Sequence, residues 1–363
     1  MRKINCHYCD KSLRITNKEH GHNLYCPRCD SLIYHTGESR ATITSLSISS
    51  LIVFLWAISQ PLLNVNILYD TQISIIDSIS LLLKSDILSG TLLIFTIIII
   101  PISILLLILL ILYYKELRIS MRYLKVLIRT YIFIKEWNMI SIYFVGLLVS
   151  MVKITDISSM TILTGLWINA LFVILLYITV NCFNPYDTLH LRSTKTSHKS
   201  LNKSIFFIIL ALIFLPAANL LPIMPIYKYS VYFPNTLLDG VISFYEEGDY
   251  FVSFVILISS IILPFIKLLG ITFMIIMVKY NIFLSLRKTT TKFYIFINKI
   301  SKFSMIDIYV VVLASSFIQY DNLIRIEIGT AFIPFTLVVF FTVLANKSFD
   351  TKLIWKDTCI HDQ

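Results

Sequence analysis

Long apolar stretches alternate along the chain with short segments that hold most of its charges. A helix of about 20 apolar residues crosses the hydrocarbon core of a bilayer. The uncharged stretches that reach this length are Ala41–Tyr69, Ile87–Tyr114, Ile157–Tyr186, Ser204–Tyr227 and Ile328–Asn346. This pattern predicts membrane-spanning helices.

Three further stretches raise the prediction to eight spans. Trp137–Val152 is shorter, but it can cross the bilayer with its flanking residues. Tyr250–Val278 is interrupted only by Lys267, and Phe303–Tyr320 only by one acidic residue, Asp307. The chain is 57% hydrophobic and 14% charged, whereas soluble proteins carry about a quarter charged residues. We therefore predict an all-α polytopic membrane protein.

The charged segments differ in the sign of their charge. Those at 113–137, 187–203 and 279–302 are strongly basic, and the segments between them are acidic or sparsely charged. Because positively charged loops stay in the cytoplasm, we expect a multi-pass protein with both termini cytoplasmic. The formal net charge of +10 follows from this sorting and does not indicate nucleic-acid binding. Residues 1–40 contain no apolar stretch typical of a cleavable signal peptide.

Two Cys-x-x-Cys motifs precede the first predicted span. Cys6, Cys9, Cys26 and Cys29 have the spacing of a zinc ribbon, in which Zn²⁺ takes four soft ligands at tetrahedral corners. We expect one structural zinc, because four thiolates leave no open position for catalysis. The alternatives are an iron site of rubredoxin type and a redox-active thiol pair. A redox pair would need an exposed motif beside a βαβ unit, which the sequence does not indicate.

The apolar body contains two similar halves. Pro101 inside the second span corresponds to Pro264 inside the sixth, and Phe183 after the fourth span corresponds to Phe349 after the eighth. We therefore predict two tandem four-helix transmembrane modules in the same orientation, with a substrate path between them or plain duplication for stability. The predicted order is a cytoplasmic zinc ribbon at 1–40, a first module at 41–186, a basic connector at 187–203, a second module at 204–350 and a cytoplasmic tail at 351–363.

Lys267 is the strongest candidate for a residue that lines a transport path. A lysine inside a bilayer costs roughly a few kcal/mol and usually faces a cavity or a partner. Pro264, one turn earlier, removes a helical hydrogen bond and can kink the span. We hypothesise a charge-compensated network of Lys267 with Asp307, and the alternative is a lysine that snorkels to the cytoplasmic interface. The hydroxyl residues that could complete the network are Ser259, Ser260, Thr272 and Ser304.

Polar residues at the predicted periplasmic side have two possible roles. Asn219 and Pro222 end the fifth span and could shape the outer mouth of the path, or simply form a turn. The next loop is acidic and could dock a periplasmic partner, although such charges are often only solvated. Its acidic residues are Asp239, Glu246, Glu247 and Asp249. Nucleotide-binding glycine motifs and nucleophile elbows are absent from the sequence, so we expect neither nucleotide binding nor an enzyme.

Several longer motifs carry a family resemblance that extends over essentially the whole chain. They are the Cys-x-x-Cys pairs, Leu215–Met224, Glu247–Tyr250, Pro264–Leu269, Ser304–Asp307 and Ser348–Trp355. With these motifs the chain resembles the paraquat-inducible protein A family. The resemblance implies a protein of the bacterial inner membrane that exchanges phospholipid between the inner and outer membranes or maintains envelope integrity. It also implies a periplasmic partner with mammalian-cell-entry (MCE) domains, which form tunnels across the periplasm.

The chain departs from the family pattern in two places. Members commonly carry a second Cys-rich ribbon between the modules, whereas the connector here keeps only Cys182 and cannot form a four-thiolate site. In addition, Ile104 and Ser141 stand in the first module where Lys267 and Asp307 stand in the second. We therefore expect charge-dependent chemistry in the second module.

Two other roles stay open at this point. A membrane oxidoreductase would use the N-terminal cysteines, and its activity would follow their oxidation state. A scaffold, or a stress or redox sensor, would use the ribbon to recruit a cytoplasmic partner, and Lys267 and Asp307 would then be dispensable.

Overall fold

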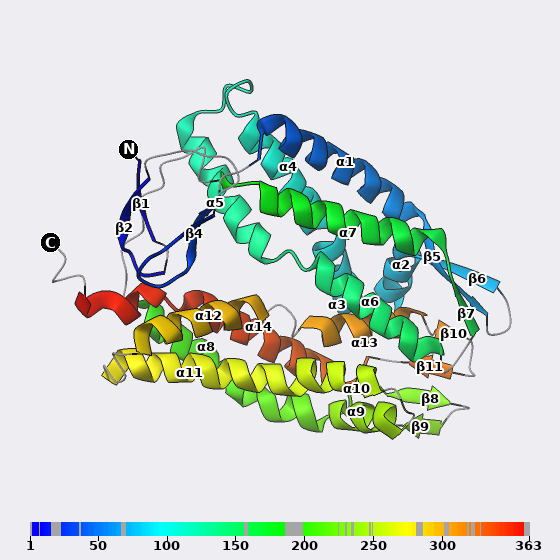
Figure 1. The fold of residues 1–363 in the computed structure, drawn as a ribbon. Helices are drawn as coiled ribbons and strands as arrows, with labels where there is room; N and C mark the ends of the chain where they lie inside the picture. Colours follow the sequence, from blue (N-terminus) through cyan, green and yellow to red (C-terminus); the bar gives the residue numbers. More distant parts are fainter. Residues whose placement is uncertain are drawn as a thin grey trace.

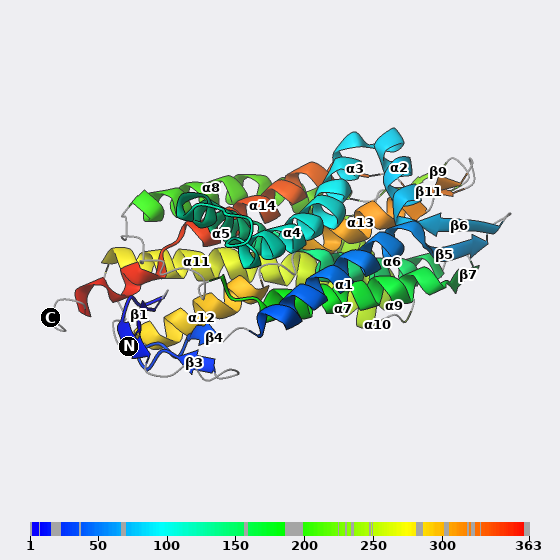
Figure 2. The same ribbon diagram turned by 90° about the horizontal axis from the view of Figure 1, so that it is seen from above.

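The helices form an elongated bundle with both chain termini at one end and small β-sheets at the other (Figure 1, Figure 2). The structure is a computed structural model. It describes residues 2–6, 8–15, 23–35, 38–66, 70–155, 159–185, 199–223, 225–228, 231–233, 236–246, 248, 250–280, 286–300, 305–317, 319–320, 324–326 and 328–358.

The N-terminal segment consists of two antiparallel hairpins. They pair β1 (Arg2–Asn5) with β2 (Ser12–Ile15), and β3 (Asn23–Tyr25) with β4 (Leu32–His35). Each hairpin turn carries one Cys-x-x-Cys motif. Asp10 and Asp30, directly after the second cysteine of each motif, have φ values of 59° and 55°. Aspartate tolerates this left-handed region better than most residues, so both hairpins can turn in the same way.

The first half of the membrane body runs from α1 to α7. Its elements are α1 (Arg40–Ser59), β5 (Pro61–Asn66), β6 (Asp70–Ser74), α2 (Ile75–Ser85), α3 (Ile87–Leu93), the π-helical η1 (Ile94–Ile99), α4 (Ile100–Leu112), α5 (Met121–Glu136), α6 (Ile140–Thr155), β7 (Ser159–Ile162) and α7 (Thr164–Cys182). A long first helix is thus followed by a hairpin, a short helix and a second long helix that a π-helical segment interrupts.

The second half has a closely similar order of elements. They are α8 (Lys199–Leu220), β8 (Ile226–Lys228), β9 (Val231–Phe233), α9 (Leu237–Glu246), α10 (Tyr250–Ile256), the π-helical η3 (Leu257–Ile262), α11 (Leu263–Tyr280), α12 (Arg287–Ile300), α13 (Ile306–Phe317), β10 (Gln319–Tyr320), β11 (Ile324–Ile326) and α14 (Phe332–Ser348). A 3₁₀-helix, η6 (Thr351–Thr358), follows. The residues of η6 fall in the segment that sequence analysis describes as a tail, and Leu353, Ile354 and Trp355 are buried.

Matching caps begin the short helices after the two hairpins. The Ser74 hydroxyl accepts a hydrogen bond from the Asp77 amide, and the Asp77 carboxylate accepts one from the Ser74 amide. Thr236 and Asp239 exchange the same pair of bonds ahead of α9. This reciprocal arrangement is a capping box, which satisfies amides that have no partner inside the helix. Asp77 and Asp239 therefore have a local structural role in addition to their charge.

Two small sheets, absent from the all-α prediction, close the end of the bundle away from the termini (Figure 1). Their strand orders are β6-β5-β7 and β10-β11-β8-β9. In each sheet a hairpin that follows the first long helix pairs with a strand that precedes the last one. The strands are two to six residues long and interrupt apolar stretches, so they do not stand out in the hydropathy pattern.

Six helical stretches of the described residues are long and apolar enough to cross a membrane. They are Arg40–Ser59, Ile87–Leu112, Met121–Met151, Thr164–Cys182, Ser200–Leu220 and Ser253–Tyr280. Phe332–Ser348 is apolar but shorter, and α13 has 12 residues. The prediction of a multi-pass, mainly helical membrane protein is confirmed, while the number of eight spans stays a prediction.

Two of the basic segments contain amphipathic helices, α5 and α12. In α5, Leu124, Ile128 and Tyr131 are buried at the i, i+4, i+7 spacing of one helix face. The basic residues Arg122 and Lys125 are exposed on the other side. From the sequence these segments are predicted only to be basic.

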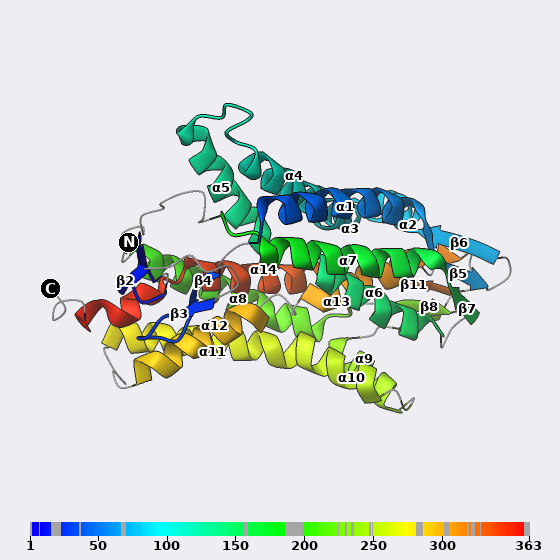
Figure 3. The same cartoon turned by 45° about the horizontal axis from the view of Figure 1, so that its top comes forward.

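The two halves meet along α6 and α13, which lie side by side (Figure 3). A Cβ atom added to Gly146 would lie 2.8 Å from Cβ of Tyr309, so the two helices approach closely there. The Ser150 hydroxyl donates to the Val310 carbonyl at 3.3 Å, and the rings of Tyr143 and Tyr309 meet edge to face. One apolar core therefore contains residues of both halves.

Candidate metal centre and membrane site

The four N-terminal cysteines converge on one point. Their Sγ atoms all lie within 4.8 Å of one another, and all four side chains are buried. The Sγ atoms of Cys6 and Cys29 are 3.6 Å apart, and those of Cys9 and Cys26 are 3.4 Å apart. Since Zn–S bonds are about 2.3 Å, tetrahedral ligands would lie about 3.8 Å apart. The donor set and its spacing fit one four-thiolate metal ion.

The surroundings of the cysteines support this geometry. The Ser31 hydroxyl lies 3.0 Å from Cys29 Sγ and 3.3 Å from Cys6 Sγ, where it can orient both sulfur atoms. The Cys6 amide donates to the Lys11 carbonyl, and the Cys26 amide donates to the Ser31 carbonyl. A redox-active motif would keep one cysteine exposed, and none of these four is exposed.

A second polar site lies on the interrupted helix formed by α10, η3 and α11. Pro264 is the second residue of α11 and has no amide hydrogen, so the Ser260 carbonyl loses its usual helical partner. The Leu263 amide instead bonds to the Ile258 carbonyl, five residues earlier. Such wide turns recur at functional positions in helices. The hydroxyl of Ser260 donates to the Ile256 carbonyl at 2.7 Å.

Ser260, Pro264 and Lys267 share one face of this helix, at i, i+4 and i+7. The Lys267 side chain is only 1% exposed, and Ser260 is 3% exposed. A lysine enclosed in this way does not snorkel along the outside of the bundle to the interface. When the two halves are aligned by their interrupting prolines, Ile97 and Ile104 take the places of Ser260 and Lys267, and both isoleucines are buried. The polar face thus belongs to the second half.

The structure describes only some of the other predicted path residues. Thr272 is half-buried on α11. Asp307 lies in α13, the helix at the seam between the halves, while its side chain lies outside the described part of the chain, as does the whole of Ser304. The Lys267–Asp307 network therefore stays a prediction.

The residues predicted at the outer mouth have clear local roles. Asn219 donates its side-chain amide to the Leu215 carbonyl at 2.9 Å near the end of α8. The Pro222 carbonyl accepts the Ala331 amide at 3.0 Å, which ties the end of α8 to the start of α14.

Of the acidic residues predicted to dock a partner, two are described. Asp239 and Glu246 are exposed, and the bonds from Thr236 hold the pKa of the Asp239 carboxyl below its usual value. Glu247 and Asp249 lie outside the described residues.

A groove of about 570 Å³ lies at the seam between the two halves. The first half contributes α3 and η1, and the second half contributes the beginning of α14. Its lining includes Leu88, Leu92, Phe95, Ile99, Phe332 and Thr336. The Thr336 hydroxyl is buried and has no hydrogen-bond partner among the described residues. The groove cannot be predicted from the sequence, because its two walls are far apart in the chain.

Comparison of the sequence with known proteins identifies its family. The sequence model described as "Paraquat-inducible protein A" matches residues 41–190 and 201–358. The chain belongs to the paraquat-inducible protein A family. This confirms the resemblance seen in the motifs.

Three relatives cover almost the full length of this family member. A "Probable intermembrane transport protein" of Haemophilus influenzae is 26% identical over 97% of the chain and 95% of the relative. "Lipophilic envelope-spanning tunnel protein A" of Escherichia coli is 23% identical over 96% and 90%. "Intermembrane transport protein PqiA" of Escherichia coli is 25% identical over 97% and 95%. No solved structure matches the chain.

Proposed function

We propose that the protein is a non-enzymatic component of the bacterial inner membrane that handles phospholipid for a periplasm-spanning partner with MCE domains. The names of the relatives, intermembrane transport protein and envelope-spanning tunnel protein, support transport between membranes. Phospholipid as the cargo and an MCE-domain protein as the partner follow from the family resemblance.

The enclosed Lys267 is the observation that carries this proposal. A lysine inside a membrane span indicates a functional site, and a phospholipid phosphate is an anion that an ammonium group can bind. The wide turn at η3 immediately precedes the helix α11 that carries Lys267. The groove at the seam falls in the usual size range of ligand sites, about 300–1,000 Å³, and its apolar walls suit acyl chains.

The proposed topology has eight spans with both termini in the cytoplasm. The termini share one end of the bundle with the basic helices α5 and α12 (Figure 1), as the distribution of positive charge requires. The four cysteines would then hold one structural Zn²⁺ in a reducing compartment, where thiolates bind metal rather than form disulfides. We further propose that the similar order of elements in the two halves reflects an internal repeat.

Replacing Lys267 by methionine tests the lipid role. Lys267→Met keeps the length of the side chain and removes a buried charge. Because removal of one member of a buried charge pair destabilises a protein, the thermal midpoint of the variant in detergent is measured as well, and transfer is compared at a temperature at which the variant is folded. We expect phospholipid transfer from protein-containing vesicles to acceptor vesicles to fall by roughly 10- to 100-fold. This range corresponds to the loss of one charge-assisted hydrogen bond. Lys279→Met is the matched control, because Lys279 is an exposed lysine in the last turn of the same helix.

The same experiment separates the rival functions. Full transfer by Lys267→Met, together with loss of function in a Cys6→Ser variant, would favour a scaffold or sensor built on the ribbon. Native mass spectrometry and elemental analysis of the purified protein should find one zinc per chain and bound phospholipid. Absence of metal, with the four thiols oxidised in pairs under anaerobic handling, would favour the oxidoreductase instead.

A further inference from the structure

The ribbon docks on the second half of the molecule, although the chain connects it to the first half. The four cysteines lie in the same apolar cluster as residues of α8, α11, α12, α14 and η6. None of the buried members of this cluster comes from the elements α1 to α7. Figure 2 shows the hairpins beside α12 and close to the C-terminal helix.

The docking contacts come from inside the metal-binding motifs. Tyr8 lies between Cys6 and Cys9, and its ring meets Tyr294 of α12 edge to face at 6.4 Å. Arg28 lies between Cys26 and Cys29, and its guanidinium lies 4.9 Å from the ring centre of Trp355 in η6. A Cys-x-x-Cys motif takes a fixed shape when both cysteines bind one ion. The positions of both docking side chains therefore depend on the bound metal.

An ion-pair contact completes this surface. Asp30, directly after Cys29, accepts from the side-chain amines of Lys288 and Lys292 at 2.8 and 3.0 Å. The two lysines are four residues apart, on one face of α12. These groups are about half exposed, so the pairs contribute orientation more than stability.

The receiving surface is connected to the core of the second half. The Tyr294 hydroxyl donates to the Asn346 carbonyl at 2.9 Å, at the end of α14. The Trp355 indole donates to the Thr291 hydroxyl at 3.0 Å, which joins η6 to α12. A Cβ atom at Gly270 would lie 2.4 Å from Ile297, so α12 also packs tightly on α11, three residues from Lys267. The ribbon therefore rests on α12, which packs directly on the helix that carries Lys267.

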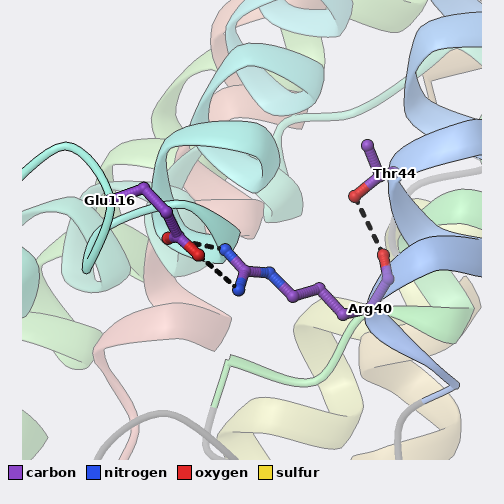
Figure 4. Close-up of polar contacts among 3 residues, drawn as sticks. All are labelled: Arg40, Thr44 and Glu116. Carbon is purple, nitrogen blue, oxygen red and sulfur yellow. Dashed lines mark hydrogen bonds and ion pairs between the residues drawn. The ribbon is translucent and has the colours of Figure 1, made fainter.

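The connection from the ribbon to α1 is anchored on the first half. The Arg40 guanidinium donates two hydrogen bonds to the Glu116 carboxylate, at 2.7 and 2.8 Å (Figure 4). In the next turn the Thr44 hydroxyl donates to the Arg40 carbonyl. The Glu38 amide also donates to the carbonyl of Cys182 at the end of α7. Asp30 thus contacts the second half, whereas Glu38 and Arg40, a few residues later in the chain, contact the first half.

We propose that the ribbon is a metal-dependent clamp. It contacts both halves at the terminal end, and it holds them together there only when its four cysteines bind an ion. Loss of the metal releases Tyr8 and Arg28 from their fixed positions, so α12 and η6 lose the surface that covers them. This clamp does not depend on which cargo the protein handles.

Hydrogen-exchange mass spectrometry of the full-length protein in nanodiscs tests the clamp. When zinc is removed with a chelator, amide exchange should accelerate by roughly tenfold or more in Arg287–Ile300 and Thr351–Thr358. Exchange in Thr164–Cys182 should stay unchanged, and zinc alone should restore the original rates. Faster exchange confined to the hairpins at 2–35 would overturn the proposal.

A docking variant that keeps all four cysteines provides a second test. Tyr8→Ala combined with Arg28→Ala should accelerate exchange in α12 and η6 while zinc is still bound. Because linkage between binding equilibria is reciprocal, the variant should also bind zinc more weakly in equilibrium competition with a chelator. Arg129→Ala, an exposed position on α5, is the control. Unchanged exchange in α12 and η6 of the zinc-loaded double variant would disprove the clamp.

Discussion

Asp10 and Asp30 set the backbone direction after each pair of cysteines. Both have positive φ, and each amide donates to the carbonyl of the first cysteine of its own motif. A left-handed residue costs most side chains about 1–2 kcal/mol, with aspartate and glycine the better tolerated types. The two aspartates therefore allow the hairpins to bring their sulfur atoms together.

The positive φ of Asp10 predicts how its variants bind zinc. Asp10→Val should weaken zinc retention by about five- to tenfold, because a β-branched side chain disfavours positive φ. Asp10→Gly should retain zinc within about twofold of the parent protein, since glycine adopts positive φ freely. Competition with a chromogenic chelator measures both. Equal retention by the valine and glycine variants would show that the backbone conformation is unimportant.

Two glycines allow backbone contacts between the ends of helices. A Cβ atom at Gly165 would lie 2.2 Å from the Pro61 carbonyl oxygen, and one at Gly329 would lie 2.2 Å from that of Pro222. Gly165→Ala and Gly329→Ala should each destabilise the protein by about 1–3 kcal/mol. Gly240→Ala is the control, because nothing lies within 4 Å of its added Cβ. Thermal unfolding in detergent should show lower midpoints for the first two variants only.

At the scale of elements, the interrupted helices show how similar segments can differ in chemistry. In both halves a π-helical segment precedes a proline in the second long helix. The missing proline amide accounts for the wide turn in each case. Only the second half places a buried serine and lysine on that face. The interruption is thus a feature of both halves, whereas the charge belongs to one.

The stability that the ion pair between Arg40 of α1 and Glu116, after α4, contributes should depend on pH. The Arg40 guanidinium holds the pKa of the Glu116 carboxyl below its usual value. A carboxyl with a lowered pKa in the folded state contributes stability above its unfolded pKa and loses it as pH falls through the folded pKa. The melting temperature of Glu116→Gln should therefore lie slightly below that of the parent at about pH 7, and the difference should vanish in strong acid.

The difference should also shrink at high salt, because both side chains are exposed. Glu246→Gln, an exposed carboxylate of α9 without a described ion pair, is the control. A difference between Glu116→Gln and the parent that persists in acid would mean that packing, and not charge, accounts for the effect.

At the scale of the whole molecule, the two halves are in contact at several positions along the bundle. α6 packs on α13 through the bundle, and Lys347 of α14 pairs with Glu136 of α5 at 2.9 Å. The ribbon adds the contact at the terminal end, and the groove lies on the same seam toward the sheets. Loss of the metal should therefore remove the contact that the ribbon makes at the terminal end and leave the α6–α13 contact and the Lys347–Glu136 ion pair in place.

The sequence by itself determined the features that depend on neighbouring residues. Apolar stretches predicted the helical membrane body, the cysteine spacing predicted the thiol cluster, and Pro264 beside Lys267 predicted an unusual polar position in a span. Each of these signals lies within a few turns of chain, so local physical chemistry is enough to interpret it.

Only the tertiary structure decided the features that join distant segments. The strands of the two sheets, the groove at the seam and the contact of Asp30 with Lys288 all connect residues far apart in sequence. Their formation depends on how the helices pack, and one hydropathy profile is compatible with several packings. The capping boxes show the same limit on a small scale, since Asp77 and Asp239 are simply acidic residues until their helices are located.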